Sequence, residues 1–304
     1  MNIAVIGLGR MGAAIAHRLH KAGHTVFGFD VSAQAREAVH KEGIAVFDSI
    51  ADVAKKADVF WLMVPVGRPV DDTLQALKSH LQSGAIIIDG GNSKWTDSQR
   101  RAQELSSDGI PFLDCGTSGG LKGREIGFSL MIGGDKRVYE KVENFFKAIA
   151  APRGYGYVGS SGAGHYVKMV HNGIEYALLQ SYAEGFQLIK EGSFKDSDLD
   201  LEQITGIWQH GSVIRSWLLD LAHDIFVDAG DAQHLRDISG ELAEGGTGRW
   251  SVEDAERNQV PVPMMKEALD IRKWSRETGG NYATKVVALL RNRFGGHDFK
   301  RIKE

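Results

Sequence analysis

Five polar residues recur at helical spacing in the middle of the chain. In order, at positions i, i+3, i+4, i+7 and i+8, they are Lys168, His171, Asn172, Glu175 and Tyr176. An α-helix would project all of them from one face, which would carry a base, an acid and three hydrogen-bonding groups. Most polar helix faces are simply solvated, but this mixture favours acid–base chemistry. The base and the acid would stand about 10 Å apart along the helix axis, with room for a small polar substrate.

A glycine-rich turn near the start predicts a second site. The apolar run 3–6 leads into Gly7-Leu8-Gly9-Arg10-Met11-Gly12, which opens a helical pattern. In such a turn, the first glycine permits the tight bend and the second lets the backbone approach a pyrophosphate. The third lets the helix pack close to the strand. Asp30 ends the next β-rich run, about 20 residues later, where a carboxylate binds ribose hydroxyls. We therefore expect a dinucleotide site.

Asp30 also bears on the choice of dinucleotide. A carboxylate accepts hydrogen bonds from the ribose of NAD, whereas it would repel the 2′-phosphate of NADP. Val31 and Ser32 offer no cation for that phosphate, and Arg36 is the nearest one. The sequence therefore favours NAD as the cofactor and leaves NADP as the alternative.

Alternating apolar and helical segments predict the fold class. The runs 59–64 and 85–89 are almost continuously apolar, as in parallel strands covered on both faces. We expect a Rossmann-type α/β domain with a doubly wound, mainly parallel sheet over 1–161, bounded by the glycine-dense stretch 154–164. An all-α domain with an extended tail should follow over 162–304. Its helices are predicted at 162–191, 201–207, 213–226, 232–244, 263–278 and 283–290.

Residues that directly follow the predicted strands are candidates for ligand contacts, because ligands of open α/β sheets bind beyond the carboxyl ends of the strands. Val64-Pro65-Val66 and Asn92 are expected to contact the cofactor, although the local pattern at Asn92 alone slightly favours an ordinary turn residue. Ser118-Gly119-Gly120 would expose backbone N–H groups to an anionic ligand, or would simply form a flexible turn.

Composition excludes several classes of protein. The chain has 304 residues and a net charge of −3, which argues against a general nucleic-acid or membrane-surface binder. Residues 1–7 are typical of a first strand rather than a signal peptide, and no apolar run is long enough to span a membrane. The single cysteine, Cys115, allows no intrachain disulfide and favours a cytoplasmic protein, with Cys115 itself as a small buried hydrophobe. No cluster with metal-ligand spacing is evident, so no metal is expected.

Taken together, these motifs resemble the 6-phosphogluconate dehydrogenase (decarboxylating) family in its short bacterial form, within the β-hydroxyacid dehydrogenase superfamily. The resemblance runs from Met1 to about Phe299. Its most specific blocks are 7–12, 89–93, 118–120, 164–176, 246–250 and 291–297. Related β-hydroxyacid dehydrogenases share the glycine turn, the Ser-Gly-Gly loop and the Lys-x-x-Asn pair. They are not expected to carry the continuation His171-Asn172-Gly173-Ile174-Glu175-Tyr176.

The resemblance implies oxidative decarboxylation of 6-phospho-D-gluconate to D-ribulose 5-phosphate and CO2, with reduction of NAD(P)+, as in the pentose phosphate pathway. Lys168 would take the C3 hydroxyl proton during oxidation and then polarise the keto oxygen while CO2 leaves. Glu175 would protonate C1 of the enediol, and Asn172 is the third residue assigned to catalysis.

The resemblance also assigns the substrate contacts by position. The carboxylate and hydroxyls would be held by Asn92, Ser118, Gly119, Gly120, His171 and Asn172, and the phosphate end by Tyr176, Thr247, Arg272, Arg291 and His297. Long-form members place a lysine two residues before the threonine of the Gly-Thr-Gly block, where this chain has Gly245. We expect the grip on the phosphate to loosen, or to pass to Arg249 or another group.

In this family the C-terminal tail enters the active site of a neighbouring subunit. The chain lacks the duplicated helical region of the long form, so the resemblance implies a homodimer or homotetramer whose tail residues complete a neighbouring site. Two other functions stay open: a β-hydroxyacid dehydrogenase that does not decarboxylate, and a non-catalytic NAD-sensing regulator. Glu175 together with the basic tail argues against the first, and retention of both Lys168 and Glu175 argues against the second.

Overall fold

The computed structural model describes residues 1–197, 199–230 and 235–302. The chain divides into two compact units, Met1–Met169 and Val170–Glu304. The division falls inside helix α8 (Ala163–Glu191) and beyond the predicted domain boundary at 161/162. That boundary stays a prediction.

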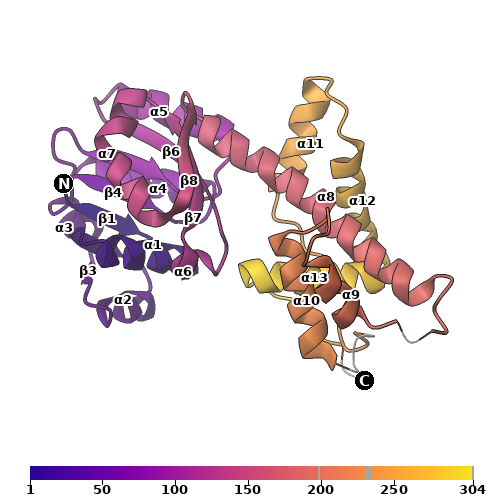
Figure 1. The fold of residues 1–304 in the computed structure, drawn as a ribbon. Helices are drawn as coiled ribbons and strands as arrows, with labels where there is room; N and C mark the ends of the chain where they lie inside the picture. Colours follow the sequence, from indigo (N-terminus) through magenta and orange to yellow (C-terminus); the bar gives the residue numbers. More distant parts are fainter. Residues whose placement is uncertain (198, 231–234, 303–304) are drawn as a thin grey trace. The chain divides into compact units, whose positions relative to one another are not determined.

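The N-terminal unit is built on one eight-stranded sheet with strand order β3-β2-β1-β4-β5-β6-β7-β8 (Figure 1). Its strands are β1 (Ile3–Ile6), β2 (Val26–Phe29), β3 (Ala45–Phe47), β4 (Val59–Leu62), β5 (Ile86–Asp89), β6 (Phe112–Ser118), β7 (Phe128–Gly134) and β8 (Ala150–Gly159). Its helices before α8 are α1 (Arg10–Lys21), α2 (Ala33–His40), α3 (Ile50–Ala54), α4 (Arg68–Lys78), α5 (Trp95–Ser106), α6 (Gly123–Ile126) and α7 (Lys136–Ile149). All neighbouring strands are parallel except β6 and β7.

Helices cover both faces of this sheet, which confirms the predicted doubly wound, mainly parallel architecture (Figure 1). Ile3 and Val5 of β1 pack with residues of α1, α2 and α7, whereas Ala4 and Ile6 pack with residues of α3, α4 and α5. Successive side chains of a strand point to opposite faces. A strand buried on both faces must therefore be apolar at every position, which is the pattern that the sequence shows.

Strand β8 was not predicted. The glycine-dense stretch 154–164 was interpreted as a domain boundary, but Ala150–Gly159 pairs in parallel with β7. Tyr155 and Tyr157, two positions apart, pack against the sheet core, while the residue between them is Gly156. Two register shifts interrupt this pairing, which accounts for the weak strand signal in the sequence.

The C-terminal unit is helical, as predicted. After α8 its helices are α9 (Leu201–Trp208), α10 (Trp217–Ala229), α11 (Thr247–Arg257), α12 (Pro263–Thr278) and α13 (Tyr282–Gly295). The main core joins apolar faces of α8, α10 and α13, including Phe186, Phe226 and Val286. Helix α10 starts later than predicted because the Ser216 side chain caps it by accepting a hydrogen bond from the Leu219 N–H.

The helix predicted over 232–244 is wrong where the structure describes it. Residues 235–244 contain no helix, and residues 232–234 lie outside the described part of the chain. Instead, the backbone of this segment pairs with the tail: Ser239 N donates to Lys300 O (2.9 Å) and Ile302 N donates to Asp237 O (2.8 Å). The last helix is predicted only over 283–290. However, α13 extends to Gly295 and buries Arg291.

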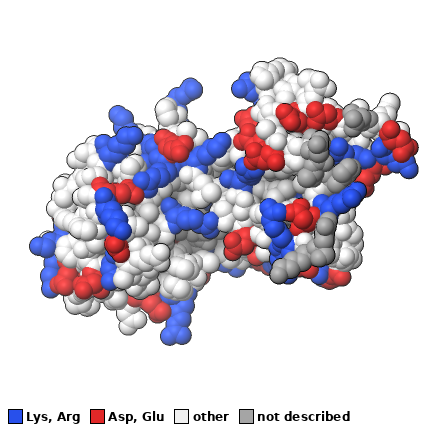
Figure 2. Space-filling view, turned by 90° about the horizontal axis from the view of Figure 1, so that it is seen from below, with Lys and Arg blue, Asp and Glu red and all other residues white. Residues whose placement is uncertain are grey.

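Charge is mixed on the face of the molecule drawn in Figure 2, where basic and acidic side chains alternate rather than gather by sign. None of the described helices is both long enough and apolar enough to span a membrane.

Candidate functional site

The glycine turn between β1 and α1 has the geometry that a pyrophosphate requires. Gly7 has a φ of +93°, which side chains rarely adopt, and a Cβ on Gly12 would overlap the carbonyl oxygen of Gly7. By contrast, no described atom lies within 4 Å of where a Cβ of Gly9 would stand. Gly9 is also the N-cap of α1, and no described side chain caps the helix there. The turn is therefore tightly packed on the protein side and open at the helix N-terminus, which fits a dinucleotide.

Asp30 is tied to this turn by its own carboxylate. Oδ2 accepts a hydrogen bond from Leu8 N (2.6 Å) and Oδ1 accepts one from Ser32 N (2.8 Å). Each carboxylate oxygen can accept a further hydrogen bond, as a ribose hydroxyl would require. Arg36 Nη1 donates to Asp30 O (2.6 Å) and to Val31 O (3.3 Å), so this cation is engaged by the loop backbone. The Asp30 carboxylate therefore lies beside the glycine turn, and its contact with the ribose of NAD stays a prediction.

The predicted loop residues lie beyond the carboxyl ends of β4, β5 and β6. Pro65, Val66 and Asn92 are exposed there. Thr117 Oγ1, near the end of β6, donates to Gly90 O (3.1 Å) and so joins β6 to the loop after β5. Gly119 and Gly120 have φ angles of +137° and +53°, which explains why the turn after Ser118 uses glycine.

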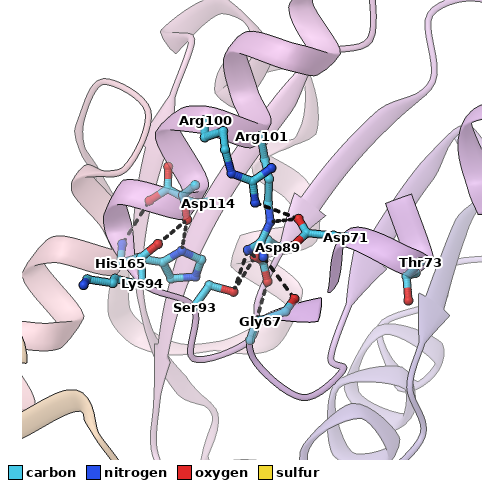
Figure 3. Close-up of polar contacts among 12 residues, drawn as sticks. Gly67, Asp71, Thr73, Asp89, Ser93, Lys94, Arg100, Arg101, Asp114 and His165 are labelled. Atoms are coloured by element: carbon cyan, nitrogen blue, oxygen red, sulfur yellow. Dashed lines mark hydrogen bonds and ion pairs between the residues drawn. The ribbon is translucent and has the colours of Figure 1, made fainter. Parts of the chain in front are cut away.

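Lys168 lies on α8, with only 8% of its surface exposed. Its aliphatic stem packs on Gly116 of β6, where any Cβ would overlap the Lys168 Cβ. The start of α8 is held by the fully buried Asp114, whose Oδ1 accepts from Gly162 N (2.6 Å) and whose Oδ2 accepts from His165 N (2.9 Å) (Figure 3). This capping carboxylate was missed by sequence reasoning. Its one available signal was an acid directly after the apolar pair Phe112-Leu113.

Four of the other predicted residues meet in the C-terminal unit. The His171 Nδ1 lies 3.0 Å from Asn172 Oδ1 and 3.9 Å from Glu175 Oε2. Asn172 Nδ2 donates to Thr247 Oγ1 (3.0 Å), the first residue of α11. The amide of Asn172 is thus oriented by a residue 75 positions away, and it lies one turn before Glu175 on the same helix.

Arg272 is the most unusual side chain of this cluster. It is 1% exposed, its guanidinium carbon stands 3.4 Å from the centre of the Tyr176 ring, and Nη1 and Nη2 have no hydrogen-bond partner among the described residues. Burial lowers the pKa of Arg272 to about 10, and the nearby charge of Arg291 acts in the same direction. Arg291 is itself buried, which lowers its pKa as well. The unpartnered donors of Arg272, together with the second buried cation, Arg291, form a site suited to a phosphate.

The expected substitute for the missing lysine at Gly245 is otherwise engaged. Arg249 Nε and Nη2 donate to the two carboxylate oxygens of Glu244, each at 2.8 Å, and Arg276 Nη2 lies 3.5 Å from the same carboxylate. Glu244 therefore competes with any anionic ligand for Arg249, which leaves Arg272 and Arg291 as the better candidates for the phosphate end. His297 is exposed, with its ring 6.0 Å from that of Phe294.

Cys115 is fully buried, as predicted for a small hydrophobe, and burial raises the pKa of its thiol. Within the described ranges, no group of three or more His, Cys, Asp and Glu side chains is placed to hold a metal ion.

Comparisons with known proteins cover nearly the whole chain. The model of the NAD binding domain of 6-phosphogluconate dehydrogenase matches residues 2–162, and that of the 6-phosphogluconate dehydrogenase C-terminal domain matches residues 164–288. The chain is 45% identical over 305 aligned residues to an NAD(+)-dependent, decarboxylating 6-phosphogluconate dehydrogenase of Haloferax volcanii, covering 99% of each protein.

Longer relatives match in part. A second NAD(+)-dependent, decarboxylating 6-phosphogluconate dehydrogenase, from Bacillus subtilis, is 36% identical, and the match covers 89% of this chain but 60% of that protein. Among solved structures, a 6-phosphogluconate dehydrogenase of Plasmodium falciparum superposes with a TM-score of 0.82 at 28% identity, over 91% of this chain and 62% of that one.

Proposed function

The chain belongs to the 6-phosphogluconate dehydrogenase family, and from this membership we propose that it oxidises 6-phospho-D-gluconate and releases CO2, forming D-ribulose 5-phosphate with reduction of NAD+. The observation that carries the proposal is the match over 99% of both chains to an NAD-dependent, decarboxylating relative. Bound NAD+ supplies the acceptor for the hydride that leaves substrate C3.

We propose Lys168 as the group that moves the proton at the C3 oxygen. As C3 is oxidised, its hydroxyl proton passes to the Lys168 amine. In the resulting β-keto acid the bond between C2 and the carboxylate breaks, and the electron pair moves onto the keto oxygen. The Lys168 ammonium stabilises that oxygen by donating a hydrogen bond. The buried stem of Lys168, packed on Gly116, holds the amine in place for both steps.

Glu175 completes the reaction in this proposal. Loss of CO2 leaves an enediolate, and the Glu175 carboxyl protonates its C1 while the negatively charged oxygen becomes the carbonyl of ribulose 5-phosphate. Lys168 and Glu175 are both on α8, seven positions apart. Asn172 lies between them in sequence, and its amide, held by Thr247, is proposed to bind the substrate hydroxyls. Asn92, Ser118, Gly119, Gly120 and His171 are proposed as further contacts to the carboxylate and hydroxyls.

The phosphate end is assigned to Tyr176, Thr247, Arg272 and Arg291, with His297 supplied by the tail. The orphaned Nη1 and Nη2 of Arg272 support this assignment, because a buried guanidinium without an acceptor is costly unless a ligand provides one. The non-decarboxylating β-hydroxyacid dehydrogenase and the non-catalytic NAD sensor have no observation that favours them.

The function is tested by steady-state kinetics with 6-phosphogluconate and either NAD or NADP, recording both reduced cofactor and released CO2. We expect equal amounts of the two products and a higher kcat/KM with NAD, because the Asp30 carboxylate repels a 2′-phosphate. Formation of reduced cofactor without CO2 would point to the non-decarboxylating alternative. The absence of both products would refute an enzymatic role on this substrate.

Glu175→Gln is expected to oxidise 6-phosphogluconate in a first turnover but to form ribulose 5-phosphate about 10²-fold more slowly, because the amide cannot deliver a proton. Rapid-mixing absorbance of NADH, combined with quenched product analysis, separates the two steps. Glu184→Gln, an exposed position on the same helix, is the matched control. Normal product formation by Glu175→Gln would remove Glu175 from the mechanism.

We propose that the enzyme is a homodimer or homotetramer in which the tail completes a neighbouring active site. The exposed His297 supports exchange of residues beyond α13, whereas Arg291 is buried in its own unit near Tyr176. A cytoplasmic location, expected from the single cysteine, stays a prediction.

A chain lacking residues 296–304 is expected to lose most activity but to keep NADH binding. Because the tail also pairs with residues 237–239, the decisive measurement is complementation with a full-length Lys168→Met chain. If the tail acts in a neighbouring subunit, mixed oligomers regain activity that neither parent has. Activity that does not return in proven mixed oligomers would contradict exchange.

A further inference from the structure

One buried cation of the N-terminal unit lies outside the mechanism described above. Arg101, on α5, is 1% exposed and is among the largest fully buried side chains of the described residues. Its guanidinium donates through all three nitrogens: Nε to Asp71 Oδ1 (2.8 Å), Nη2 to Gly67 O (3.1 Å), and Nη1 to Ser93 Oγ (3.3 Å) and Asp89 Oδ2 (3.5 Å) (Figure 3). Such a charge is tolerated in a protein interior only when its donors are satisfied.

These partners lie on two different segments of the chain, one after β4 and one at the end of β5. Gly67 and Asp71 stand at the start of α4, directly after Val64-Pro65-Val66. Asp89 and Ser93 flank the other loop, which contains Asn92. The Asp89 carboxylate shapes that loop by accepting from Gly91 N (3.1 Å) and from Ser93 Oγ (2.7 Å). Arg101 therefore joins the segment that follows β4 to the segment that follows β5.

We propose that Arg101 is a positioning residue for the cofactor. Its guanidinium holds the segment after β4 and the segment after β5 together, so that Val64–Val66 and Asn92 keep one fixed arrangement toward the cofactor. The inference rests on the proposed function only in assigning these loops to NAD. A planar guanidinium can satisfy acceptors in several directions at once, whereas a lysine ammonium at the end of a flexible stem cannot reproduce this fork. Loops ordered before binding lose less conformational freedom when the cofactor binds.

The neighbouring residue provides a matched control. Arg100 shares the acceptor Asp71 Oδ1 (2.9 Å) and also binds Glu104, but its side chain is 45% exposed and none of its partners among the described residues belongs to the Asn92 loop. Hydrogen bonding from Arg101 is the largest cause of the lowered pKa of Asp71, with Arg100 contributing less. The two arginines thus share one carboxylate, but Arg101 alone of the pair also binds Ser93 and Asp89 in the described contacts.

The test compares Arg101→Lys with Arg100→Lys in the full-length protein, using NADH fluorescence titration, KM for 6-phosphogluconate and thermal unfolding. We expect Arg101→Lys to weaken NADH binding by about tenfold or more, equivalent to about 1.4 kcal/mol, with KM for the substrate nearly unchanged. Arg100→Lys should bind NADH within about twofold of the parent. Arg101→Lys that is folded at the assay temperature yet binds NADH like the parent would overturn the proposal.

If Arg101→Lys does not fold, Asp71→Asn provides the second test, because this half-exposed acceptor can lose its charge without emptying the core. Weakened NADH binding in Asp71→Asn but not in Arg100→Lys supports positioning through Arg101, and unchanged binding in both refutes it. The readout is independent of turnover. A parent protein that binds NADH but does not act on 6-phosphogluconate would refute the proposed function and leave this comparison intact.

Discussion

Replacing Lys168 with methionine is expected to lower kcat/KM for 6-phosphogluconate by about 10³- to 10⁴-fold, the upper range for general acid–base catalysis. The loss is large because the same amine accepts the hydroxyl proton and then stabilises the keto oxygen. Methionine preserves much of the buried stem that packs on Gly116, so we expect α8 and the fold to survive. NADH binding should be unchanged, since the proposed role of Lys168 is toward the substrate.

Initial rates of NADH formation and of CO2 release measure this prediction, and NADH titration verifies that the cofactor site is intact. Lys190→Met is the control on the same helix, where Lys190 Nζ donates to Leu199 O (3.3 Å) and no catalytic role is proposed. A Lys168→Met enzyme that kept more than about a tenth of the parent rate would exclude Lys168 as the acid–base group.

Arg272→Met is expected to lower kcat/KM for 6-phosphogluconate and to raise the free energy of unfolding of the protein. Loss of the buried phosphate contact should reduce kcat/KM for 6-phosphogluconate by about 10³-fold, within the roughly 2–5 kcal/mol measured when a buried charged partner is removed. In the absence of substrate, however, Nη1 and Nη2 of this buried guanidinium have no hydrogen-bond partner among the described residues, and burial already lowers the pKa of Arg272 to about 10. Replacing it with an apolar side chain should raise the free energy of unfolding by about 1–4 kcal/mol.

Denaturant unfolding without substrate, together with steady-state kinetics, tests both directions at once. Arg276→Met is the control, because Arg276 is partly exposed on α12 and its guanidinium already binds Glu244. This substitution should not raise the free energy of unfolding in the same way. Unphosphorylated gluconate provides a further control, because its weak turnover should be the same for the parent and Arg272→Met. A variant that is destabilised while its KM for 6-phosphogluconate stays unchanged would show that Arg272 supports structure and not phosphate binding.

Much of the fold could be predicted because its signals are local. The glycine turn at 7–12, the acid at Asp30 and the apolar runs of β4 and β5 each lie within a few consecutive residues, and their steric and burial requirements act on that scale. Strand β8 was missed because its glycines and register shifts weaken the local pattern, and its pairing with β7 is decided by contact between segments. The helix predicted over 232–244 failed for a related reason: backbone groups at 237–239 pair with the tail, some 60 residues later.

The candidate site likewise has one part that local sequence patterns predict and another that only tertiary contacts decide. Helical periodicity alone placed Lys168, Asn172 and Glu175 along one helix, because 3.6 residues per turn is a property of the backbone. Only the tertiary structure brought Arg272 onto the ring of Tyr176, left its Nη1 and Nη2 without a hydrogen-bond partner among the described residues, and joined the segments after β4 and β5 through Arg101. Those contacts link residues far apart in sequence. Their strength depends on burial, which raises the cost of an unpaired charge and the value of a paired one, and burial is a property of the packed fold rather than of any local stretch of chain.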